Sequence, residues 1–195
     1  MGRFLGQLST DAFGITIPEL KVGLIDFGKP ALADDDGILD DAATDTTNAT
    51  SYPNDTTTDF LAQPDIPRGL KFKPSAAADA GNIVVEGLDY EGTPVKEEVA
   101  TNGASAVTST YAFKKVTKIT FPKDDDGITW DVGWNDKLGL PYKFASKPPV
   151  QEYDDGTLQT TAGTLVVDAD KLAKNTYDPN GTLDGDSEIK LVVFL

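Results

Sequence analysis

The stretch Ile83-Val-Val-Glu-Gly-Leu-Asp-Tyr-Glu-Gly-Thr-Pro-Val-Lys-Glu-Glu-Val99 decides the fold class, because it holds two β-type runs separated by a short turn. Residues 83–88 and 95–99 have the composition of strands, and Tyr90-Glu-Gly92 between them has the chemistry that turns require. The stretch therefore predicts two strands that follow each other closely in the chain, as in a β-hairpin.

The same succession of apolar runs and turns extends from Gly69 to the C-terminus. Further strands are expected at residues 70–72, 110–121, 128–132, 138–144, 163–167 and 189–194. Asp, Asn and Gly lie between them, at residues 79–81, 102–103, 124–127, 154–156 and 180–181. Only residues 168–174 look like a turn or two of helix, which Asn175 would end. This pattern predicts an all-β domain over residues 68–195, as a β-sandwich or a jelly-roll-like barrel.

An apolar segment with several glycines, residues 1–30, precedes this domain. The alternation in Phe13-Gly-Ile-Thr-Ile17 favours an extended chain, and Pro18 interrupts it. We interpret residues 1–30 as an extended N-terminal arm, which packs either on its own domain or on a neighbouring subunit. Its candidate partner-binding residues are Phe4, Leu5, Phe13, Ile15, Ile17 and Leu20.

Residues 31–67 contain nine Asp and no Lys or Arg. A block of like charge with few large apolar side chains buries too little surface to order itself, so the sequence predicts a loop-like acidic connector. The alternative interpretation is a loop that binds a cation or a partner.

The overall composition excludes several classes of function. The formal net charge of −15 disfavours nucleic acid and anionic membrane surfaces as partners. The chain has neither His nor Cys, so the common catalytic triads and histidine- or thiolate-ligated zinc sites are excluded. No signal peptide or apolar span of membrane length is recognisable. We expect a protein that is not an enzyme and that carries no cofactor.

Two local patterns are candidate binding sites. Asp178-Pro-Asn-Gly-Thr-Leu-Asp-Gly-Asp-Ser-Glu188 places oxygen-bearing side chains at every second position, as a calcium loop would, but it lacks the spacing of an EF-hand, and a tight turn is the preferred interpretation. Trp130 and Trp134 form an aromatic cluster that favours a core or an interface, with a glycan-stacking platform as the alternative.

Three segments carry a resemblance to a known family. Leu88–Val99, Ala112-Phe-Lys-Lys-Val-Thr-Lys-Ile-Thr-Phe121 and Asp136-Lys-Leu-Gly-Leu-Pro-Tyr-Lys143, in this order, resemble structural proteins of tailed-phage virions, and the ending Thr176–Gly185 is similar as well. The likeness covers about residues 82–195, and residues 136–143 are its most specific part.

The resemblance implies a capsid decoration or cement protein on the exterior of the virion. Its expected partners are the major capsid protein and further copies of itself, with a homotrimer as the expected assembly. Two alternatives stay open: a tail or head-fibre module that binds host glycans, and a calcium-dependent extracellular adhesion domain.

Overall fold

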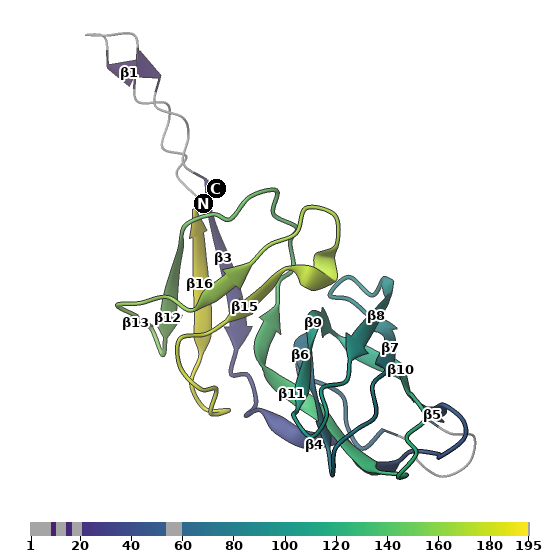
Figure 1. Ribbon diagram of the computed structural model, residues 1–195. Helices are drawn as coiled ribbons and strands as arrows, with labels where there is room; N and C mark the ends of the chain where they lie inside the picture. Colours follow the sequence, from purple (N-terminus) through teal and green to yellow (C-terminus); the bar gives the residue numbers. More distant parts are fainter. Residues whose placement is uncertain (1–8, 11–14, 17–20, 54–59, 195) are drawn as a thin grey trace.

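The chain folds into three larger antiparallel sheets, and its all-β class is thereby confirmed (Figure 1). The computed structural model describes all residues except 1–8, 11–14, 17–20, 54–59 and 195. A separate two-stranded pair near the N-terminus joins β1 (Ser9–Thr10) to β2 (Ile15–Thr16). The only helical element among the described residues is the 3-10 helix η1 (Leu172–Lys174).

The first two sheets enclose one core and curl into a half-barrel. The first sheet has the order β5 (Thr50–Tyr52), β10 (Lys115–Phe121), β7 (Asn82–Leu88), β8 (Pro94–Ala100). The second has the order β14 (Thr164–Val166), β15 (Thr176–Asp178), β11 (Thr129–Gly139), β6 (Arg68–Pro74), β9 (Val107–Phe113), and β4 (Asp34–Ala43) also pairs with β11.

The third sheet forms one end of the molecule (Figure 1). Its order is β13 (Thr157–Leu158), β12 (Val150–Asp154), β16 (Ile189–Phe194), β3 (Val22–Gly28). One of its faces packs on a second core that includes Phe27 and Tyr177, whose rings stack 6.4 Å apart.

Strand β11 joins the two cores. Its residues Trp130, Val132 and Trp134 are buried in the first core, whereas Leu138 is buried in the second. The sequence predicted separate strands at residues 128–132 and 138–144, but a single strand runs through to Gly139. The two halves of the molecule therefore share one continuous backbone element.

A change of sheet divides the run at residues 110–121, which was expected to be one strand. β9 pairs with β6, but β10 pairs with β7 in the other sheet. Lys114, which lies between β9 and β10, donates its N–H to Leu88 O at 2.8 Å. Gly87 permits this crossing, because a Cβ at this position would collide with the carbonyl oxygen of Lys115.

The side chain of Glu97 closes the gap between the edge strands β8 and β9. Its carboxylate accepts hydrogen bonds from Thr110 N at 2.7 Å, Thr110 Oγ1 at 2.6 Å and Tyr111 N at 3.1 Å. Glu97 is 8% exposed, and it replaces ladder hydrogen bonds that the two sheets do not form with each other here. The half-barrel is thus closed by a side chain.

The expectation of a loop-like connector at residues 31–67 is wrong for β4 and β5. Five Asp residues of β4 lie at exposed or half-buried positions, while Ile38, Leu39 and Ala42 face the core. The strand forms because these apolar residues pack, and because Lys71 and Lys73 of β6 pair with the outer carboxylate of Asp35.

Part of the predicted arm also belongs to the folded body. β3 pairs with β16 through registers such as Leu24 opposite Val192, and its Ile25 and Phe27 are buried. An extended arm outside the domain can therefore include only residues before Val22.

A buried guanidinium connects the segments where the two cores meet. Arg68 is 0% exposed, and its Nε donates to Asn135 O at 2.8 Å, while Nη1 donates to Ala31 O at 2.9 Å and to Asp65 Oδ1 at 3.3 Å. Its Nη2 lies 3.5 Å from Asp136 Oδ1. Burial raises the pKa of Asp136, and the charge of Arg68 counteracts this effect.

We expect Arg68→Met to lower the free energy of unfolding by about 3–5 kcal/mol, because the carbonyls and carboxylates around it would lose their donor. Urea denaturation measures the loss. Lys118→Met, which removes a charge from an exposed position, serves as the control and should change stability by less than about 0.5 kcal/mol. Adding Asp136→Leu to Arg68→Met should recover part of the loss, and equal effects of Arg68→Met and the control would contradict the role of Arg68.

Candidate functional site

The predicted arm residues lie mostly outside the described part of the chain. Phe4, Leu5, Phe13, Ile17 and Leu20 belong to the residues that the structure does not describe. Ile15 is in β2, where its backbone is paired with that of Thr10. Binding of a partner through these six residues therefore stays a prediction.

The two tryptophans lie in the core, as the preferred interpretation of their spacing predicts. Trp130 is 1% exposed and stacks on Phe121 with 5.5 Å between ring centroids. Trp134 is 8% exposed, and its Nε1–H donates to Leu32 O at 2.9 Å. A sugar ring needs an open aromatic face, so these side chains do not form a glycan-stacking platform in this structure.

The Asp-rich segment 178–188 contains a self-bonded turn. Asp184 Oδ1 accepts the N–H groups of Ser187 at 2.8 Å and Asp186 at 2.9 Å, and Ser187 Oγ donates to Asp184 Oδ2 at 2.9 Å. These hydrogen bonds hold the pKa of Asp184 below its ordinary value, with the Ser187 N–H as the main cause. Both carboxylate oxygens of Asp184 are thus engaged by the turn itself.

Ionised Asp184 should stabilise the fold above about pH 4, and this contribution should disappear as the pH falls through the lowered pKa. Asn at this position can still accept the turn hydrogen bonds but does not titrate. We expect the melting temperature of Asp184→Asn to fall less than that of wild type when the pH is lowered from about 6 to about 2.5. Asp186→Asn, whose backbone N–H rather than side chain takes part in the turn, is the control, and identical pH profiles of wild type and Asp184→Asn would contradict this role.

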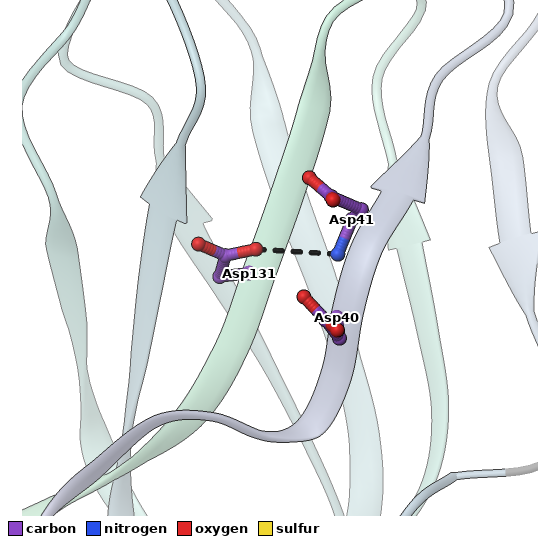
Figure 2. Close-up of side chains that lie close together, drawn as sticks. All are labelled: Asp40, Asp41 and Asp131. Atoms are coloured by element: carbon purple, nitrogen blue, oxygen red, sulfur yellow. Dashed lines mark hydrogen bonds between the residues drawn. The ribbon is translucent and has the colours of Figure 1, made fainter.

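Three carboxylates from two distant parts of the chain converge on the surface of the second sheet. Figure 2 shows Asp40 and Asp41 of β4 beside Asp131 of β11, with one oxygen of each lying within 4.8 Å of the others. Asp41 N donates to Asp131 Oδ1 at 3.2 Å, and Thr129 Oγ1 donates to Asp41 Oδ1 at 3.1 Å. Oxygen ligands of this kind could hold a hard cation such as Ca²⁺.

The cluster already has a cationic neighbour. Lys73 Nζ lies 3.7 Å from Asp131 Oδ2 and 3.7 Å from Asp35 Oδ2. Asp40 and Asp41 are exposed and Asp131 is half-buried. Sequence patterns did not indicate this cluster, because Asp131 lies about 90 residues from Asp40 and Asp41 and meets them only through the pairing of β4 with β11.

We expect Asp40→Asn to raise the melting temperature by about 1–3 °C in low salt with a chelator present, because the substitution relieves repulsion among three carboxylates. Asp170→Asn, at an exposed position elsewhere, is the control. A calcium titration of wild type and Asp40→Asn then tests coordination, since a bound ion would stabilise wild type more than the variant. A fall in the melting temperature of Asp40→Asn would contradict the repulsion.

Two buried glutamates have the burial of catalytic carboxylates but serve the fold. Glu97 closes the half-barrel, and Glu152, 2% exposed, accepts hydrogen bonds from Tyr177 Oη at 2.5 Å and from the N–H groups of Gly163 at 2.8 Å and Asn180 at 3.1 Å. Burial, together with Glu152, raises the pKa of Tyr177. Backbone N–H groups and side-chain hydroxyls hold both carboxylates, which leaves them poorly placed for acid–base chemistry.

A shallow groove of about 350 Å³ runs between β8, β9 and η1. Its charged lining mixes both signs, with Lys143 and Lys171 close to Glu91 and Asp170. Lys171 Nζ donates to Tyr111 Oη at 2.7 Å, so one of the cations is engaged. This mixture does not favour one class of ligand.

The outer face of the third sheet carries a group of exposed and half-buried apolar side chains. Val22 and Leu24 of β3 are 57% and 61% exposed, and Val192 and Phe194 lie opposite them on β16. Leu158 of β13, 49% exposed, extends this surface at the far edge. We call the surface formed by Val22, Leu24, Val192, Phe194, Tyr153 and Leu158 the apolar face.

Comparisons with known proteins found no matching family model, no similar curated protein and no similar solved structure. Among the described residues, no helix has the length and apolar character needed to cross a membrane.

Proposed function

We propose that this chain is a non-enzymatic virion structural protein that binds the outer surface of a phage capsid and stabilises the shell. The observation that carries the proposal is the apolar face, which is exposed at the end of the molecule where residues 1–20 join the body. Exposed apolar surface of this kind is typical of a protein that docks on another protein.

The distribution of charge also supports docking through this end. In residues 1–21, Arg3 and Lys21 balance Asp11 and Glu19, so the net charge of −15 resides entirely on residues 22–195. A neutral, apolar segment can approach a protein shell without electrostatic penalty, while the acidic body keeps neighbouring particles apart and soluble.

The chemistry of the side chains supports a role other than catalysis. The chain has no His or Cys, and the buried carboxylates Glu97 and Glu152 are held by structural hydrogen bonds. A rigid body of three sheets with interlocked cores suits a cement protein, which must resist deformation when it bridges capsid subunits.

The resemblance of residues 82–195 to phage virion proteins supplies the specific partner. On this basis the partner is the major capsid protein, and the copies assemble as trimers at symmetric positions of the shell. The acidic body favours contact with basic patches on that shell, and such contacts would weaken as salt increases.

Deletion of residues 2–20 should abolish binding to shells that lack the protein while leaving the domain folded. The deletion ends at residue 20 because β3 begins at Val22 and its Ile25 and Phe27 belong to the second core. Co-sedimentation with purified shells measures binding, and thermal unfolding monitors the fold. Leu61→Asp, a change at an exposed apolar residue outside the apolar face, is the control and should bind as wild type does. Full occupancy by the deletion variant would refute the arm as the docking element.

Cryo-electron microscopy of the virion tests the location independently. Density for this chain on the outer capsid lattice would support the decoration role. Density confined to the tail would refute it and favour the host-binding alternative.

A further inference from the structure

The main part of the apolar face lies on the neighbouring strands β3 and β16. Gln151 of β12, which lies opposite Val192, and Lys190 separate this part from Tyr153 and Leu158. Phe194 lies opposite Val22, and Val192 lies opposite Leu24, in the pairing of β16 with β3. On the other side of β16, Tyr153 of β12 lies opposite Lys190 and also opposite Leu158 of β13. Alternate residues of a strand share a face, so these side chains point away from the second core.

Only one end of this outer face is charged. Lys190 Nζ lies 3.7 Å from Asp26 Oδ2 and 2.6 Å from Glu188 Oε2. These ion pairs form a small charged group beside the apolar residues. The apolar residues of β3 and β16 cluster at the opposite end, where β3 begins and β16 ends. A sheet face of this composition normally packs against a second layer.

We propose that the apolar face binds residues 1–20 of a second copy of this chain, so that the same end of the molecule joins neighbouring copies to one another as well as to the shell. The segment has apolar residues throughout, among them the alternating Phe13, Ile15 and Ile17, and it is attached to the body at the edge of the face. Each copy therefore carries both an open apolar face and an apolar segment of matching chemistry.

Electrostatics favours exchange of the segment over direct packing of two faces. Face-to-face packing would bring together two bodies that each carry the full charge of −15, whereas the docking segment, residues 1–20, carries a formal charge of only −1 from Arg3, Asp11 and Glu19. A segment of such low charge that extends to the neighbour buries apolar surface and keeps the acidic bodies further apart.

Chain geometry permits the exchange. β3 begins at Val22, at the end of the sheet where β16 also ends. Because β1 pairs with β2, the chain folds back between Thr10 and Ile15, and the roughly ten residues from this turn to Val22 span up to about 33–36 Å when extended, which is enough to reach a copy packed alongside. Docking on the same copy would instead need a reversal of the chain immediately before β3.

Because the chain has no cysteine, disulfide cross-linking can test this exchange directly. Leu24→Cys places one thiol on the apolar face, and Ile15→Cys places one in the N-terminal segment. The two full-length variants are mixed without any capsid shell, at high protein concentration and in salt that screens the acidic charge, and then oxidised. We expect a cross-linked dimer in the mixture and its loss when Val192→Asp is added to the Leu24→Cys chain. Leu61→Asp in the same chain should leave the cross-link unchanged.

Several outcomes would overturn the proposal. Equal cross-linking of Leu24→Cys with itself would indicate face-to-face packing, and equal cross-linking of Ile15→Cys with itself would indicate pairing of the segments. Cross-linking within single chains of the double variant Ile15→Cys/Leu24→Cys, without dimers, would indicate docking on the same copy. Absence of any cross-link, with both thiols shown to be reactive by maleimide labelling, would also refute it. Since no shell is present, failure here is separate from failure of capsid binding.

Discussion

The buried guanidinium of Arg68 is the constraint on which the arrangement of the two cores depends. It bonds to Ala31 in the link between β3 and β4, to Asp65 just before β6, and to Asn135 within β11. A fully buried cation is tolerated only where several oxygens surround it, so the three segments are required to meet at this point. The positions of β3 and β4 on either side of the junction follow from this requirement.

Strand β11 connects the site of Arg68 to both cores of the molecule. The register of β11 against β6 shifts between Trp134 and Leu138, and Arg68 lies opposite Leu138 at this irregularity. The strand can therefore present Trp134 to the first core and Leu138 to the second without a break in its backbone. At Gly133 a Cβ would collide with the carbonyl of Asp34, so the close approach of β4 to β11 also depends on a residue without a side chain.

Local patterns in the sequence were sufficient for part of this fold. The strands β7 and β8 were predicted from Ile83–Val99 because they are neighbours in the chain and pair with each other. β4 was missed because its Asp residues suggested a solvated loop, whereas the strand depends on pairing with β11 and on Lys71 of β6, contacts that composition does not reveal. The burial of Trp130 and Trp134 followed from their spacing, but the Asp40–Asp41–Asp131 cluster required the tertiary register.

The body and the N-terminal segment divide the physical tasks that the proposed function requires. Buried side chains such as Glu97 and Arg68 fix the body, and its acidic surface keeps it soluble. Val22 and Leu24, paired with Phe194 and Val192, leave apolar side chains open at the end that joins residues 1–20. A protein that must pack densely on a shell gains specificity from this separation, because repulsion between acidic bodies opposes every contact except the one made through the neutral end.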